Sequence, residues 1–145
     1  MIRPIAIFFL VGTCGLGCKA SHSTQYDKLF ELTQPAGTPD AINGTWGGST
    51  GPFETRIVYA SDSITVANKC GATVVGAHAA AKISADAITV LAAASEKIDK
   101  CYAETTPGTL TRCAGATAAN CFTLANRTLT MFGGSASMEF TKLSD

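Results

Sequence analysis

The sequence predicts an all-β protein, a small antiparallel barrel of about eight strands that follow one another as a meander. A short segment typical of a β-hairpin occurs three times, apolar and polar residues alternate over short stretches, and Gly-rich turns separate these stretches. The chain of 145 residues is long enough for one domain. We expect a signal peptide at residues 1–17, a polar linker that begins with Cys18 at 18–41, and the barrel at 42–145.

The N-terminus has the features of a secretory signal. Arg3 precedes an uncharged apolar run from Ile5 to Leu16, and polar residues follow from Lys19. The run is shorter than the roughly 20 apolar residues of a membrane-spanning helix, and a buried core helix is the alternative. We therefore predict that the mature protein is exported.

Two cysteines end this apolar run, and Gly15-Leu16-Gly17-Cys18 resembles a bacterial lipobox. Lipidation of Cys18 leaves four cysteines in the mature chain, whereas lipidation of Cys14 leaves an odd thiol. The resemblance therefore implies a lipid anchor on Cys18 and a protein held at the outer membrane of the bacterial envelope, on its periplasmic or its outer side. Cleavage after Ala20, which would release a secreted protein, is the alternative.

The remaining four cysteines predict two disulfides, because thiols of exported proteins oxidise. Cysteines spaced as zinc ligands are missing, and His78 is the only histidine after residue 41, so we expect no metal. Counting strands alternately up and down places Cys113 and Cys121 at one barrel end. We predict the pairs Cys70–Cys101 and Cys113–Cys121, with Cys70–Cys121 as a competing pair.

The mature chain begins with a polar tether from Lys19 to Ala41, in which Tyr26 to Leu32 is long enough for one or two helical turns. The repeat follows, and each copy has an apolar residue, four small or polar residues, and an apolar-Thr-apolar triplet. The four central residues are typical of a hairpin turn and the triplet of a returning strand. The copies are Tyr59–Val66, Ile83–Val90 and Leu124–Met131.

The same alternation predicts the other strands, and Gly71 and Gly133-Gly134 mark turns. A helix from Ile83 to Ile98 is the rival interpretation, because apolar residues there also fit a period of 3.6. The β-branched Ile-Thr-Val triplets favour strands. The predicted strands are Glu54–Tyr59, Ile64–Cys70, Thr73–Ile83, Ile88–Ala92, Glu96–Tyr102, Leu110–Cys113, Cys121–Leu124, Thr128–Phe132 and Ser137–Leu143.

The segment Asn43-Gly44-Thr45-Trp46, the repeated hairpins and the ending Phe140-Thr141-Lys142-Leu143 resemble the lipocalin-like domains of bacterial lipoproteins. The resemblance covers roughly Ile42 to Leu143. It implies that Trp46 closes one barrel end beneath a basic residue from the last strands. Lys142 stands where the family has Arg, and Arg127 is the other candidate.

Counting by two from the repeat triplets places one row of side chains inside the barrel. Three consecutive inward alanines, Ala77, Ala79 and Ala81, remove volume from one wall, so they predict an apolar ligand pocket. The alternative is that Trp46, Phe122 and Phe140 fill the gap. The inward residues are Ile57, Tyr59, Ile64, Val66, Val75, Ala77, Ala79, Ala81, Ile83, Ile88, Val90, Phe122, Leu124, Leu129, Met131, Met138 and Phe140.

Composition and motifs argue against several classes of function. Eleven basic residues balance 11 acidic ones without a basic stripe, so we expect no nucleic acid partner. Gly47-Gly48-Ser49-Thr50-Gly51 lacks the setting of a nucleophile elbow and is interpreted as a loop, and His78 as a solvated side chain. We expect no enzymatic activity, no cofactor and a monomer.

Two function classes follow from this sequence. The first is an envelope lipoprotein that binds a small apolar ligand or an envelope component. The alternative is an inhibitor of an envelope or extracellular hydrolase, of protease or lysozyme type, which acts through the loop Thr105–Leu110 or the turn at Gly133.

Overall fold

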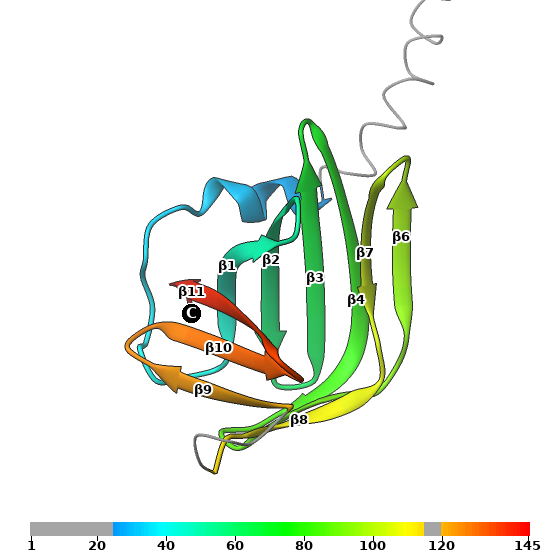
Figure 1. Cartoon of the computed structure of the whole chain (residues 1–145). Coiled ribbons are helices and arrows are strands. Elements are labelled where there is room, and N and C mark those ends of the chain that lie inside the picture. Colours follow the sequence, from blue (N-terminus) through cyan, green and yellow to red (C-terminus); the bar gives the residue numbers. More distant parts are fainter. Residues whose placement is uncertain (1–24, 115–119) are drawn as a thin grey trace, which may run out of the picture.

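Nine strands close into a barrel in the computed structural model, which describes residues 25–114 and 120–145 (Figure 1). Around the barrel the strand order is β1-β11-β10-β9-β8-β5-β4-β3-β2, and β6 and β7 form a separate two-stranded sheet. The predicted all-β barrel is therefore confirmed. The strands are β1 (Gly44–Thr50), β2 (Phe53–Ala60), β3 (Ser63–Cys70), β4 (Thr73–Ile83), β5 (Ala87–Val90), β6 (Ala94–Ile98), β7 (Cys101–Thr105), β8 (Gly108–Arg112), β9 (Cys121–Ala125), β10 (Thr128–Gly133) and β11 (Ala136–Ser144).

All three predicted repeat hairpins are present. In each one, the two apolar residues that flank the turn lie opposite each other, as Tyr59 and Ile64 do in the first hairpin. The third hairpin turns through Asn126 and Arg127, both with positive φ (50° and 64°), as the twist of a two-residue hairpin turn requires. The rival helical interpretation of residues 83–98 is wrong, because this stretch contains β5 and β6.

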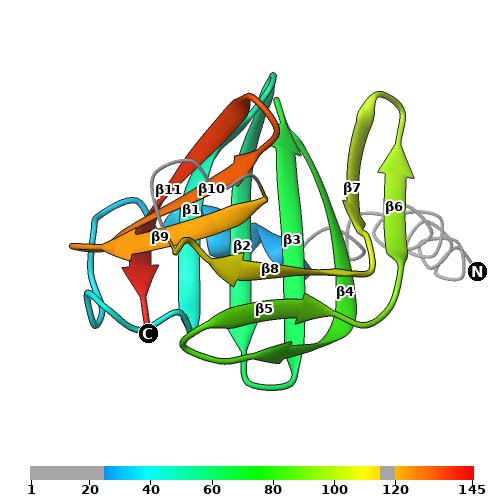
Figure 2. The same cartoon turned by 60° about the horizontal axis from the view of Figure 1, so that its bottom comes forward.

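Two features differ from the expected meander. Residues 96–102, predicted as one strand, form a hairpin that turns at Asp99, where φ is 56°. This β6–β7 hairpin leaves the barrel and stands beside β4, as Figure 2 shows. In addition, β8 and β9 run parallel, with Thr111 opposite Cys121.

Strand β1 was missed at the sequence level, where Gly47 to Gly51 was interpreted as a loop. The segment pairs with both β2 and β11 and closes the barrel. A Cβ atom on Gly48 would lie 2.6 Å from the Phe140 ring, and one on Gly47 would lie 2.7 Å from Leu143. The glycines therefore serve close packing between strands, which reduces the alternation that marks a strand in the sequence.

The N-terminal segment packs on the outside of the barrel, although residues up to 41 were expected to form a tether. The short helix η1 (Lys28–Glu31) buries Phe30 against Ala67 and Val74 on the outer face of β3 and β4. Arg56 is 5% exposed and donates hydrogen bonds to the carbonyl groups of Leu29 and Leu32. These contacts join residues 26–32 to the domain.

Both predicted disulfides are present. Cys70 is bonded to Cys101, which ties the end of β3 to the start of β7, directly after the β6–β7 turn. Cys113 is bonded to Cys121 and closes the connection between the parallel strands β8 and β9. The competing pair Cys70–Cys121 is therefore excluded.

Candidate ligand-binding site

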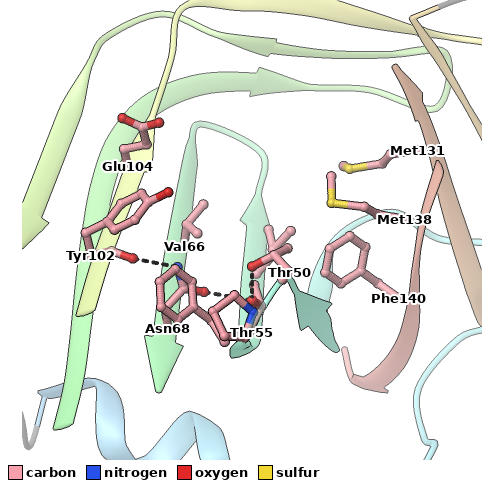
Figure 3. A pocket seen from close by; sticks show the side chains of 13 residues that line it. Thr50, Thr55, Val66, Asn68, Tyr102, Glu104, Met131, Met138 and Phe140 are labelled. Atoms are coloured by element: carbon pink, nitrogen blue, oxygen red, sulfur yellow. Dashed lines mark hydrogen bonds between the residues drawn. The ribbon is translucent and has the colours of Figure 1, made fainter. Parts of the chain in front are cut away.

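An open cavity of about 630 Å³ occupies the barrel end where β1 turns into β2 (Figure 3). We call it the mouth cavity. Strands β1, β2 and β3 form one side, β10 and β11 the opposite side, and β7 closes a third. Its lining residues are Thr50, Gly51, Pro52, Phe53, Thr55, Ile57, Val66, Asn68, Tyr102, Glu104, Met131, Met138 and Phe140.

The β6–β7 hairpin makes one wall of the mouth cavity. Tyr102 lies in edge-to-face contact with Phe53, with ring centroids 5.3 Å apart. Asn68 donates a hydrogen bond to the Tyr102 carbonyl (2.7 Å), and the Cys70–Cys101 disulfide holds the turn end of the hairpin. The wall is therefore fixed by covalent, polar and aromatic contacts.

Apolar side chains dominate the lining of the mouth cavity. Ile57, Val66 and Phe140 line its inner part, while Met131 and Met138 contribute flexible thioether side chains. Met138 is 42% exposed, so an apolar surface faces solvent at the opening. A concave apolar site with a few polar groups is the usual form of a small-molecule site.

The predicted alanine wall is filled. Ala79 and Ala81 belong to one buried cluster with Trp46, Phe122 and Phe140, so the aromatic rings occupy the volume that the alanines leave. Ala77 packs with Val75 beneath the β6–β7 hairpin, in a cluster that includes Cys101 and Ala103. Of the six residues predicted to line a ligand pocket, Phe140 alone lines the mouth cavity.

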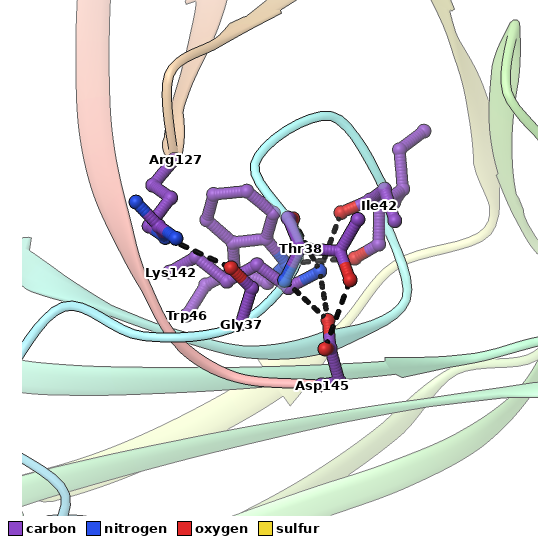
Figure 4. A network of polar contacts seen from close by, with 8 residues as sticks. Gly37, Thr38, Ile42, Trp46, Arg127, Lys142 and Asp145 are labelled. Atoms are coloured by element: carbon purple, nitrogen blue, oxygen red, sulfur yellow. Dashed lines mark hydrogen bonds and ion pairs between the residues drawn. The ribbon is translucent and has the colours of Figure 1, made fainter.

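The filled half of the barrel ends at a buried lysine (Figure 4). The Lys142 ammonium donates hydrogen bonds to the carbonyls of Thr38 (3.0 Å) and Ala41 (2.8 Å), and it lies 5.6 Å from the centre of the Trp46 ring. The Trp46 indole N–H donates to the Ile42 carbonyl. Lys142 therefore takes the position above Trp46 that the sequence resemblance implies.

The second candidate cation, Arg127, does not stack on Trp46 but donates a hydrogen bond to the Gly37 carbonyl (2.8 Å). Asp145 completes the network with an ion pair to Lys142 (2.9 Å). Hydrogen bonds from the Thr38 backbone and from Lys142 lower the pKa of Asp145 to about 2. The network binds residues 37–42 to β11.

Two other titratable groups have shifted pKa values. Burial raises the pKa of Tyr59, which is 2% exposed inside the filled core. Burial, and then the charge of Glu96, raises the pKa of Tyr26, whose ring lies against the Gly76 backbone on the outer face of β4. Neither phenol lines the mouth cavity.

A second cavity of about 570 Å³ adjoins β5 and β8. Met131 lines both cavities. The segment Thr105–Leu110, predicted from the sequence as an inhibitory loop, ends in strand β8, and its residues from Thr106 to Leu110 line this second cavity. His78 is exposed on the outer face of β4, as expected, and shares a hydrogen bond with Thr65.

Metal-ligating side chains do not gather in the described part of the chain. No group of three His, Cys, Asp or Glu side chains there is placed to hold a metal ion. None of the helices in residues 25–114 and 120–145 is both long and apolar enough to cross a membrane. The predicted signal peptide and the lipidation residue Cys18 lie outside the described residues.

The fold and its cavities define a closed β-barrel that is filled around Trp46 and open at the mouth cavity and beside β5 and β8. Comparison with protein-family models, curated proteins and solved structures found no match to the chain. The cavity was missed at the sequence level because the residues that line it come from seven turns and strands. The sequence feature that could have indicated the cavity was the pair of thioether side chains, Met131 and Met138, which were both predicted to point inward.

Proposed function

We propose that this protein is an exported, non-enzymatic lipoprotein of the bacterial envelope with a lipocalin-like barrel that binds a small apolar ligand in its mouth cavity. The single observation that supports ligand binding most is the open, mostly apolar cavity of about 630 Å³. Its volume lies within the range of roughly 300 to 1,000 Å³ that is common for small-molecule sites.

The arrangement of the barrel supports the same proposal. The core around Trp46 and Phe122 closes one end, and both side chains are 0% exposed. The opposite end carries the partly exposed Met138 and Tyr102, at 42% and 46%. An apolar ligand would cover this surface, and its burial would contribute about 25 cal/mol for each Å² removed from water.

A matched pair of variants tests ligand binding. Val66 lines the mouth cavity and lies opposite Ile57 of the neighbouring strand β2. Val58 is the next residue of β2, so its side chain faces the outside of the barrel. We expect Val66→Phe to occupy the cavity and to reduce uptake of Nile red, a neutral apolar dye, while the free energy of unfolding changes by less than about 1 kcal/mol. Val58→Phe is the control and should bind the dye as the wild type does.

Absence of dye binding by the wild type would overturn the proposal. Equal loss of binding in both variants would also count against it, because the effect would then not depend on the mouth cavity. Both variants should be compared at the same folded fraction, which urea titration establishes.

The lipid anchor requires a separate test. Intact-mass analysis of the mature protein should give a chain that begins at Cys18 and carries acyl groups. Cys18→Ala should release the domain from the membrane fraction, and Cys14→Ala should not. A mature chain that begins at Ser21 without acyl mass would refute the anchor and leave the ligand proposal standing.

A further inference from the structure

The mouth cavity contains a chain of hydrogen bonds whose direction can be worked out. Asn68 Nδ2 is 2.7 Å from the Tyr102 carbonyl, which can only accept a hydrogen bond. This contact fixes the orientation of the Asn68 amide, so its oxygen faces Thr55. The Thr55 hydroxyl must therefore donate its proton to Asn68 Oδ1, across 2.7 Å.

The next contact in the chain is determined by the first two. Thr50 Oγ1 lies 2.7 Å from Thr55 Oγ1, and Thr55 has already used its proton. Thr50 must therefore donate, which leaves its oxygen able only to accept further hydrogen bonds. Because Thr50 is half-buried and lines the mouth cavity, while Asn68 is 5% exposed, the chain presents an acceptor to a ligand there.

The charge at the opening of the cavity also favours a ligand group that donates hydrogen bonds. Among residues 25–114 and 120–145, Glu104 is the one charged residue that lines the mouth cavity, and its side chain is exposed. Arg56 is engaged on the outer face by the Leu29 and Leu32 carbonyls, and Lys69 lies there over the Phe30 ring. Lys97, opposite Tyr102, is exposed on β6 and does not line the cavity.

From the hydrogen-bond direction and the Glu104 carboxylate together, we propose that the ligand is an amphiphile whose head group donates hydrogen bonds, with an ammonium preferred over a carboxylate. The alkyl portion lies against Val66, Met131 and Phe140, and the head group lies between Thr50 and Glu104. An anionic head group meets an acceptor oxygen and a like charge instead. This inference rests on the proposed ligand-binding function and names the class of ligand.

The test compares three probes that share one alkyl chain and differ only in the head group: decylamine, decanol and decanoate. Each is titrated against the full mature chain at neutral pH by calorimetry, and by displacement of Nile red. We expect decylamine to bind about tenfold more tightly than decanoate, with decanol between them. Tighter or equal binding of decanoate would overturn the inference.

Two variants assign the preference to the named groups. Glu104→Gln should reduce the preference for decylamine over decanoate by about threefold, as expected for an exposed charge. Glu139→Gln, on the outer face of β11, is its control and should leave the preference unchanged. Thr50→Val should weaken decylamine and decanol by about threefold to tenfold and leave decanoate unweakened.

The outcomes separate the two proposals. If none of the three probes binds and the dye is not taken up, ligand binding in the mouth cavity is itself wrong. If the probes bind without regard to head group, ligand binding stands and the head-group inference is refuted. A preference for decylamine that is as large in Glu104→Gln and in Thr50→Val as in the wild type would also refute it, because other groups would then select the ligand.

Discussion

Lys142 provides the strongest single test of how the closed end of the barrel is stabilised. Its side chain is 0% exposed, and the ammonium is held by two backbone carbonyls, by the Asp145 carboxylate and by the face of Trp46. Substitution by methionine keeps a side chain of similar length and removes the charge and all three donors. The carbonyls of Thr38 and Ala41 then lose the partner that satisfies them.

The expected cost can be worked out contact by contact. A hydrogen bond from a charged donor contributes about 1.5 to 3 kcal/mol, and Lys142 makes two such bonds to carbonyl groups. The Asp145 contact adds little, because that carboxylate is exposed and screened by solvent. Methionine avoids the desolvation cost of a buried charge and so offsets part of the loss. We expect Lys142→Met to lower the free energy of unfolding by about 3 kcal/mol.

Urea unfolding followed by tryptophan fluorescence measures this effect directly. Trp46 is the only tryptophan of the chain, and it lies beside the substituted side chain. Lys82→Met, at an exposed position on β4, is the control and should change stability by less than about 0.5 kcal/mol. A loss below about 1 kcal/mol for Lys142→Met would refute the assignment of Lys142 as the residue that holds residues 38–41 to the barrel.

Three further predictions concern the core, the hairpin wall and acid stability. Ala79→Phe should overpack the filled core and lower the free energy of unfolding by about 1 to 3 kcal/mol, and an unchanged urea midpoint would contradict the filled core. Replacing Cys70 and Cys101 together by alanine opens a loop with a separation of 31 residues and should cost about 4 kcal/mol in the same assay, with Nile red binding weakened. The pKa of Asp145 is lowered from 3.8 to about 2, so its contribution to stability is complete above about pH 4 and is lost as the pH falls toward 2. The difference in urea midpoint between wild type and Asp145→Asn should therefore be constant near neutral pH and vanish below about pH 2, and a difference that grows on acidification would contradict this.

Local sequence patterns were sufficient to predict the hairpins and to predict which face of most strands points into the barrel. In the repeat, an apolar residue, a polar four-residue turn and an apolar-Thr-apolar triplet place Tyr59 opposite Ile64 and Leu124 opposite Leu129, as the structure has them. These pairings depend on neighbours a few residues apart and on the period of two along a strand. The Cys113–Cys121 disulfide was also predictable once the strand directions were counted, because this pair flanks a single loop. The same count left Cys70–Cys121 as a competitor of Cys70–Cys101, and the structure decides for Cys70–Cys101.

The sequence interpretation failed where a contact between distant segments decides the conformation. Gly47 and Gly48 lie in a strand because Leu143 and Phe140 occupy the space beside them, and nothing local in the glycines indicates this. Likewise, the chain turns at Asp99, although apolar and polar residues continue to alternate through this position. The segment predicted as a single strand is therefore a hairpin. Phe30 is buried on the barrel, although its own segment is polar.

The candidate site depended on tertiary structure for the same reason. The sequence alone predicted an N-terminal signal peptide, an all-β barrel and an inward row with three alanines, of which the structure confirms the barrel. It did not determine which end of that row stays open, because the volume left by Ala79 and Ala81 is filled by Trp46, Phe122 and Phe140 from other strands. Only the packed fold places the β6–β7 hairpin over the opposite end of the barrel. It also aligns Thr50, Thr55 and Asn68 into one directed chain of hydrogen bonds. Closure of the barrel brings these groups together, and their spacing along the chain does not.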